Sequence, residues 1–322
     1  SSLILVLGVM RLWPAVCGPL VAAAERGTCD ASGGCCEDHP LCAEWVSGDP
    51  QNCSAFPGLL EVECPQSCGL CATLADWDAC NASAVDFPPV FKKGDRIGRA
   101  FEAILSRAKE QGLEAKIVSE DPFMIEFDSF LTSDEASAVI AAGEASGFYN
   151  SSRFIDGGAD KRSSRSLFCR DDLPCSWSAT VQTVTERAAA VLGLPSHYFE
   201  HVQIVKYGVG QHYSTHSDFI AEDEELAWGP RVFTFFWYLS DAEGGATAFP
   251  NAELKVEPRV GKAVLWANVH LWETSRRLRF LPYSKADHEA QPVVSGVKYG
   301  ANLWVHNLPF RFWRRAGCRH RP

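Results

Sequence analysis

The order of elements along the chain predicts an α+β protein that is mainly β, in which helices support a β-sandwich or barrel. Helical periodicity dominates residues 95–192, whereas short β-rich runs separated by Gly, Pro, Asn and Asp dominate residues 201–306. Helices first and strands later argue against a parallel doubly wound sheet. A dense group of cysteines between Cys29 and Cys80 predicts a separate small module ahead of this domain.

Three helices are expected. The segment from Asp95 to Gly112 has apolar residues at helical spacing. Thr132-Ser-Asp-Glu135 is a capping box that opens an Ala-rich helix ending at Gly147. A further helix fits Ser176 to Leu192, with Gly193 at its carboxyl end.

Strands are expected where β-branched and aromatic residues form short runs. Phe123 to Phe127 alternates apolar and acidic residues, as a half-buried strand does. The later β-rich runs are His201–Lys206, Val232–Leu239, Ala263–Ala267 and Lys298–His306. Their aromatic residues, in Phe233–Tyr238 and at Trp304, are read as core of the β-domain rather than as a stacking platform.

Composition excludes some functions and places the chain in an oxidising compartment. The chain has 322 residues and a net charge of −10, with a pI near 5.4. Such an acidic surface argues against nucleic-acid binding, because phosphate contacts need cations. Zinc sites usually repeat C-x-x-C pairs, and of the 13 cysteines only Cys68 and Cys71 form one. Disulfides are therefore expected, including one between Cys169 and Cys175.

The amino-terminal residues 1–25 are predicted to be a secretion signal. Apolar stretches flank Arg11, and the segment ends in small residues. A signal anchor is the alternative, because the two apolar stretches together nearly reach the length of a bilayer; a buried helix is a third reading. The expected location is the lumen of the endoplasmic reticulum or the exterior. Membrane contact is expected only if the segment stays uncleaved.

Residues 26–72 are too few to build a sufficient core without cross-links. Their cysteine spacing and the segment ECPQSCGLC resemble the ShK toxin-like module. The resemblance implies the pairs Cys36–Cys71, Cys42–Cys64 and Cys53–Cys68; the sequence alone leaves all 15 pairings of six cysteines open. Residues 73–94 read as a linker, and residues 95–316 as the main domain.

A candidate metal pair lies at His216 and Asp218. Residues two apart on a strand face the same side, so the imidazole and the carboxylate can enter one cavity. They would form two thirds of the 2-His-1-carboxylate triad that binds non-haem Fe(II). Taken alone, the pair is more simply a hydrogen-bonded surface feature.

A second segment changes that reading. His288 is followed by Pro292-Val, Gly296 and, ten residues after the histidine, Lys298. Together with Tyr207-Gly-Val-Gly-Gln-His and Arg231-Val-Phe-Thr-Phe-Phe-Trp-Tyr, this spacing resembles the prolyl 4-hydroxylase branch of the Fe(II)/2-oxoglutarate oxygenases. The resemblance covers about Phe123 to His306.

This resemblance implies a double-stranded β-helix, or jelly-roll, and a defined site. His216, Asp218 and His288 would bind the iron and leave positions for 2-oxoglutarate and O₂. Lys298 would bind the distal carboxylate of 2-oxoglutarate, aided by hydrogen bonds from Tyr207 and Thr247. The three ligands and Lys298 are the expected catalytic set.

Several further residues were compared with the family's positions. Arg231 and His306 match positions tied to peptide substrates, although hydrogen-bonded strand residues would look the same. His270 lacks the downstream Pro-Val-Gly-Lys frame and is read as a loop histidine, and His212 is given no role. Arg162 to Arg165 fall where relatives carry a mobile loop over the substrate. The acidic run Glu222 to Glu225 is read as a solvated turn.

The expected reaction is hydroxylation of peptidyl proline at the 4-position, coupled to decarboxylation of 2-oxoglutarate to succinate and CO₂. Asp218 favours hydroxylation over halogenation, since related halogenases carry a small residue there. Lys298 argues against the lysyl-hydroxylase branch, which usually carries Arg. The resemblance also implies ascorbate, and a proline-rich peptide or protein as partner. Alternatives are a 2-oxoglutarate oxygenase with another target, and a non-catalytic secreted protein that binds through residues 26–72.

Overall fold

The computed structural model describes residues 87–151, 158–171 and 173–315. The expected signal segment, the ShK-like module and residues 73–86 lie outside this part of the chain. The end of the expected linker lies inside it and packs on the domain: Phe91 is buried, and its amide donates to the Asn307 side chain at 2.8 Å. In the described residues, no helix has the length and apolar character to cross a membrane.

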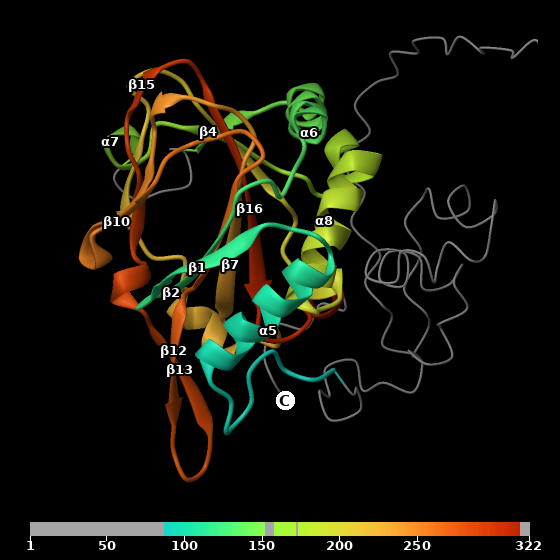
Figure 1. The fold of residues 1–322 in the computed structure, drawn as a ribbon, viewed down its shortest axis with the longest axis vertical. Coiled ribbons are helices and arrows are strands. Elements are labelled where there is room, and N and C mark those ends of the chain that lie inside the picture. The colour runs from blue at the N-terminus through green and yellow to red at the C-terminus, as the bar shows by residue number, and fades with distance from the viewer. Residues whose placement is uncertain (1–86, 152–157, 172, 316–322) are drawn as a thin grey trace, which may run out of the picture.

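Two antiparallel sheets form the body of the domain (Figure 1). The larger sheet has the order β1 (Ala115–Glu120), β2 (Phe123–Phe127), β11 (Ala263–Ala267), β7 (Arg231–Tyr238), β16 (Lys298–His306), β5 (Gln203–Tyr207), β4 (Arg165–Phe168) and β3 (Tyr149–Asn150). The smaller sheet has the order β10 (Leu254–Val256), β9 (Thr247–Phe249), β14 (His288–Ala290) and β6 (Tyr213–His216). Two further pairs are β12 (Val269–Glu273) with β13 (Leu278–Pro282), and β15 (Val293–Ser295) with β8 (Glu243–Gly244).

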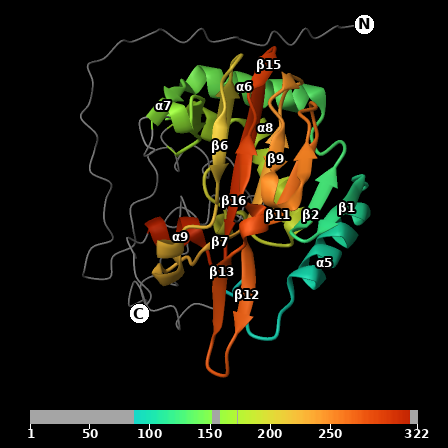
Figure 2. The same cartoon turned by 90° about the vertical axis from the view of Figure 1, so that its left-hand side faces the viewer.

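Helices cover one face of the larger sheet (Figure 1). The α-helices are α5 (Ile97–Glu110), α6 (Ser133–Ser146), α7 (Gly158–Lys161), α8 (Ala179–Leu192) and α9 (Phe310–Arg315). The apolar faces of α5, α6 and α8 pack with the larger sheet in one hydrophobic cluster. The pair β12–β13 projects beyond the rest of the domain (Figure 2).

Successive side chains along a central strand point to opposite faces of the larger sheet and so belong to two different hydrophobic clusters. On β7, Phe233, Phe235 and Trp237 belong to the cluster under the helices, whereas Phe236 and Tyr238 belong to a second cluster shared with the smaller sheet. This follows from the period of two that a strand imposes on side chains. The central strands of the larger sheet, β7, β11 and β16, are therefore buried on both faces.

The chain passes repeatedly from one sheet to the other. From β5 to β16 it runs through β6 in the smaller sheet, β7 in the larger, β9 and β10 in the smaller, β11 in the larger, β14 in the smaller and β16 in the larger. A mainly antiparallel β-domain with supporting helices is thus confirmed. Two facing sheets connected in this way have the architecture of a jelly-roll.

The expected local signals hold with one correction. Thr132 and Glu135 form the reciprocal capping box at the start of α6, and Gly193 closes α8 with a φ of 69°. The helix expected to begin at Ser176 begins at Ala179, because residues Pro174–Trp177 form a separate 3₁₀ turn. Ser178 caps α8 by accepting from the Val181 amide.

Candidate iron centre

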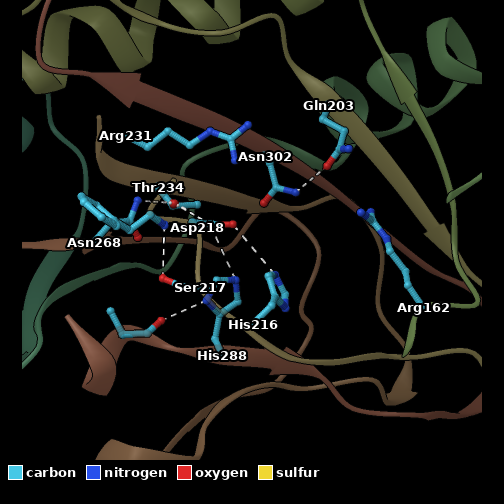
Figure 3. A network of polar contacts seen from close by, with 12 residues as sticks. Arg162, Gln203, His216, Ser217, Asp218, Arg231, Thr234, Asn268, His288 and Asn302 are labelled. Carbon is cyan, nitrogen blue, oxygen red and sulfur yellow. Dashed lines mark hydrogen bonds and ion pairs between the residues drawn. The ribbon is translucent and has the colours of Figure 1, made fainter. Parts of the chain in front are cut away.

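Three ligand side chains converge between the two sheets (Figure 3). His216 ends β6, Asp218 follows two residues later, and His288 begins β14, where it pairs directly with His216. One ligand atom from each lies within 4.8 Å of the others. The His216 Nε2 is 3.9 Å from Asp218 Oδ1, and the His288 Nε2 is 3.7 Å from Asp218 Oδ2.

Neighbouring groups fix the orientation of each ligand. The Nδ1 of His216 lies 2.9 Å from the Ser214 carbonyl, and the Nδ1 of His288 lies 3.0 Å from the Ala286 carbonyl. A carbonyl only accepts, so Nδ1–H donates and Nε2 keeps the lone pair. Thr234 donates to Asp218 Oδ2 at 2.7 Å. All three ligands are thereby held facing one point.

The electrostatics suit a divalent cation. Burial, together with the neighbouring His288, lowers the pKa of His216 to about 3. Burial raises the pKa of Asp218, but His288 and His216 outweigh it, so the pKa stays below its ordinary value. Two neutral imidazoles and one carboxylate in a buried cluster are the donor set that non-haem Fe(II) takes. The residues present therefore fit the metal.

Lys298 lies in the same cavity without a hydrogen-bonded anion among the described residues. Its side chain is 1% exposed, and its Nζ is 5.3 Å from the ring centre of Tyr207 and 5.4 Å from that of Phe236. No ion pair to a described carboxylate involves it. Burial lowers its pKa to about 7. A buried cation is costly unless paired, so this position favours an anionic ligand.

The remaining residues expected to bind the co-substrate line the same cavity. Its volume is about 850 Å³, and its walls include the triad, Lys298, Tyr207 and Thr247. The Thr247 hydroxyl accepts from the Tyr238 hydroxyl at 2.8 Å. Gly245 has a φ of 66°, and a Cβ there would stand 3.2 Å from Lys298 Cδ, so this glycine leaves room for the lysine stem.

Arg231 lines the cavity, whereas His306 lies buried behind its wall. The Arg231 Nε donates to Glu200 Oε1 at 2.5 Å, its guanidinium carbon is 3.9 Å from the centre of the Trp304 ring, and it lines the cavity. His306 is fully buried and is not among the lining residues. Its Nε2 is 2.9 Å from the same Glu200 oxygen. His306 therefore supports Glu200, which in turn holds Arg231.

Sequence reasoning missed the supporting residues. Burial raises the pKa of Glu200, but Arg231 and His306 outweigh it and lower the pKa well below its ordinary range. Tyr213 stacks on His216 with ring centres 3.6 Å apart. The Asn268 amide donates to Thr234 at 2.9 Å. Tyr213 lies three residues before His216, outside the i, i+2 frame of the metal pair, so no local pattern marks Tyr213, Glu200 or Asn268.

Three expectations about neighbouring segments were wrong. His270 lies on β12 rather than in a loop, with its ring centre 3.6 Å from that of Tyr283 and the rings tilted, and it is outside the triad as expected. Arg165 begins β4, and Arg162 bridges to Tyr213, so these residues are not a free loop. Residues Ala221–Glu225 form a 3₁₀ helix with Asp223 buried, not a solvated turn. The expected disulfide Cys169–Cys175 is confirmed.

Comparison with known proteins agrees with this site. Residues 202–306 match the model of the 2OG-Fe(II) oxygenase superfamily. This span contains the triad and Lys298. The resemblance expected from the sequence is thus confirmed at the level of a 2OG-Fe(II) oxygenase domain.

The chain is also similar to parts of two prolyl 4-hydroxylase subunits. The chain is 35% identical over 147 residues to prolyl 4-hydroxylase subunit alpha-1 of Gallus gallus, covering 42% of this chain and 26% of the relative. It is 29% identical over 223 residues to subunit alpha-3 of Bos taurus, covering 66% of this chain and 38% of the relative. The chain therefore spans about a quarter to two fifths of these relatives.

A solved structure is also similar. The viral collagen prolyl hydroxylase of Paramecium Bursaria Chlorella virus-1, in its 2OG complex, aligns with a TM-score of 0.45 and 24% identity. The alignment covers 59% of this chain and 99% of the viral protein. The fold assignment itself depends on the strand order of the two sheets.

Proposed function

We propose that this chain hydroxylates peptidyl proline at the 4-position, coupled to oxidative decarboxylation of 2-oxoglutarate to succinate and CO₂. One observation carries the proposal: a buried His216–Asp218–His288 cluster shares a cavity with Lys298, a buried cation that has no described anionic partner. The match to the 2OG-Fe(II) oxygenase superfamily and the similarity to prolyl 4-hydroxylase subunits support it.

The chain's own residues bind and orient the reactants. His216, Asp218 and His288 would hold Fe(II), which supplies the redox chemistry with O₂ when bound. Lys298 would pair with the distal carboxylate of 2-oxoglutarate, and the aromatic rings around it would keep water from screening that pair. Tyr207 and Thr247 would add hydrogen bonds to the same carboxylate.

Arg231 would act on the peptide. Glu200 and Trp304 hold its guanidinium from two sides, so it keeps one orientation at the cavity wall. A fixed side chain positions a substrate more effectively than a mobile one, because less entropy is lost on binding. His306 would contribute through Glu200 rather than by contact with the peptide.

The setting of the reaction belongs to the same proposal. The disulfide Cys169–Cys175 and the cysteine content support a lumenal or secreted location in the secretory pathway. Ascorbate would keep the iron reduced, and a proline-rich peptide or protein would be the partner.

The test uses the purified chain with Fe(II), 2-oxoglutarate, ascorbate and a panel of proline-rich peptides. We expect succinate release and hydroxyproline, measured by mass spectrometry, and loss of both in His216→Ala. His270→Ala is the matched control, since His270 lies outside the triad, and should retain activity. No succinate with any peptide would contradict the enzyme assignment. Succinate without hydroxyproline would redirect it to another target.

A further inference from the structure

Asp218, the carboxylate of the triad, is oriented by a residue far away in the sequence. The two histidines are each fixed through Nδ1 by a backbone carbonyl two residues before them. Asp218 instead lies in a bend just beyond the end of β6, outside the paired strand. Its Oδ2 accepts a hydrogen bond of 2.7 Å from the Thr234 hydroxyl on β7. Whatever holds Thr234 therefore also affects the orientation of the carboxylate.

Two hydrogen bonds run in series from Asn268 through Thr234 to Asp218 (Figure 3). The exposed fraction of each of these residues is 5% or less. An ionised carboxylate only accepts, so the Thr234 hydroxyl gives its one hydrogen to Asp218. Thr234 can then only accept from Asn268. The Asn268 side chain must therefore present its amide nitrogen, which lies 2.9 Å from the hydroxyl oxygen.

Asn268 holds this orientation at a cost in stability. It lies between β11 and β12, where its backbone amide donates to the Val232 carbonyl at 3.0 Å and its carbonyl accepts from the Tyr283 amide at 3.2 Å. With the side-chain nitrogen directed at Thr234, Oδ1 is buried and has no hydrogen-bond partner among the described residues. A buried acceptor without a partner destabilises the fold. Packing alone does not explain such an amide, whereas its effect on Thr234 and Asp218 does.

Both carboxylate oxygens of Asp218 face the point where the three ligands converge. Oδ1 is 3.9 Å from the His216 Nε2, and Oδ2 is 3.7 Å from the His288 Nε2. A carboxylate can bind a metal through one oxygen or through both. Binding through both would leave fewer positions for 2-oxoglutarate and O₂. The hydrogen bond from Thr234 engages Oδ2 and so favours binding through Oδ1 alone.

We infer that Asn268 is a positioning residue for the iron centre, which acts through Thr234 to keep Asp218 bound by one oxygen. It thereby preserves the coordination positions that the co-substrates need. The inference rests on the proposed function, since it assumes Fe(II) and 2-oxoglutarate in this cavity. A group that orients a ligand contributes to metal affinity without touching the metal. Loss of the Asn268 amide therefore weakens the binding of metal and co-substrate.

Metal binding tests the role of Asn268 without peptide or turnover. The metal-free full chain is titrated calorimetrically with Co(II), which accepts the same histidine and carboxylate ligands as Fe(II). Heat that persists in His216→Ala comes from other groups and is subtracted. We expect Asn268→Leu and Thr234→Val to raise the Kd of Co(II) about 10- to 100-fold, the usual effect of losing a group that orients a ligand. Thr234→Ser retains the hydroxyl and should bind as the wild type does.

The matched controls make the same substitutions at buried residues that do not line the cavity. Thr185 on α8 donates to the Val181 carbonyl at 2.7 Å, and Asn307 Oδ1 accepts from the Phe91 amide at 2.8 Å. Thr185→Val and Asn307→Leu should keep the wild-type Kd for Co(II). In thermal unfolding without metal, Asn307→Leu should lower the Tm more than Asn268→Leu, because it leaves a buried backbone amide without its acceptor.

Binding of 2-oxoglutarate gives a second readout. With the site saturated by Co(II), Asn268→Leu should raise the Kd of 2-oxoglutarate about tenfold, because a second oxygen of Asp218 then competes for the metal. The visible spectrum of bound Co(II) should change too, since it reports the number and geometry of the ligands.

The outcomes separate this inference from the proposed function. A Kd for Co(II) in Asn268→Leu no higher than in the control variants would overturn the inference, and so would an unchanged Kd for 2-oxoglutarate. A wild-type chain that binds both but forms no hydroxyproline would count against the proposed function alone. A wild-type chain that binds no Co(II) would count against both.

Discussion

The two faces of the larger sheet are built from the same strands but serve opposite purposes. On β7, Phe235 packs under the helices in contact range of Phe127 and Phe130, with ring centres 5.1 and 4.7 Å away. The adjacent residue toward the cavity, Thr234, instead donates to Asp218. One face gains stability by excluding water, whereas the other buries charges that a ligand must compensate. Changes on the two faces should therefore separate stability from activity.

The largest expected effect is on activity. Asp218→Ala removes the only carboxylate of the triad, so we expect 2-oxoglutarate turnover to fall about 10³-fold or more. The variant should fold normally, because it removes a buried charge rather than an apolar contact. Succinate release and thermal unfolding measured on the same preparation test both points. Retained turnover would mean that Asp218 is not a ligand.

A change on the helix-covered face of the larger sheet should lower stability and leave co-substrate binding intact. Phe235→Ala leaves a cavity among buried aromatic rings, and we expect it to lower the free energy of unfolding by about 3–5 kcal/mol. The fraction that remains folded should keep its affinity for 2-oxoglutarate. Urea unfolding and co-substrate titration distinguish this from damage to the site; a selective loss of co-substrate binding would contradict the separation of the faces.

Replacing Lys298 should weaken co-substrate binding without lowering stability. Lys298→Met removes the cation for the distal carboxylate, so we expect the KM for 2-oxoglutarate to rise about 100-fold. Since the cation is buried without a described partner, stability should rise or stay unchanged. Lys262, which is partly buried and pairs with Glu126 at 3.3 Å, provides the control: Lys262→Met should leave the KM unchanged.

The smallest effect is a dependence on pH. Burial lowers the pKa of Lys298 to about 7 in the folded protein, below its ordinary value of 10.5. Above pH 7 the free protein loses the proton that co-substrate binding needs, so the Kd of 2-oxoglutarate should rise by up to about tenfold over one pH unit and level off no higher than the roughly 100-fold loss expected for Lys298→Met. Between pH 7 and 10.5 the unfolded chain binds more protons, so Lys298 makes stability increase with pH. Lys298→Met should abolish both slopes.

Local patterns in the sequence predicted several helices and strands well. The capping box at Thr132, the alternation in Phe123–Phe127 and the bounds of Ala263–Ala267 and Lys298–His306 need only neighbouring residues, and the structure has each of them. The side-chain period of a strand predicted that His216 and Asp218 share one side. They do share a site, but β6 ends at His216 and Asp218 lies in the bend beyond it, so the period of a strand does not place the carboxylate.

Contacts between distant segments were decided by the tertiary structure. The His288 position depends on the register of β14 against β6, and the role of Glu200 depends on its contact with Arg231 at the cavity wall. The sequence marked His288 and Lys298 only through a family resemblance, and left Glu200 unmarked. By itself the sequence determined helices, strands and candidate chemistry; strand pairing over long separations determined which of those residues share one buried space, since register is set by the packing of whole sheets.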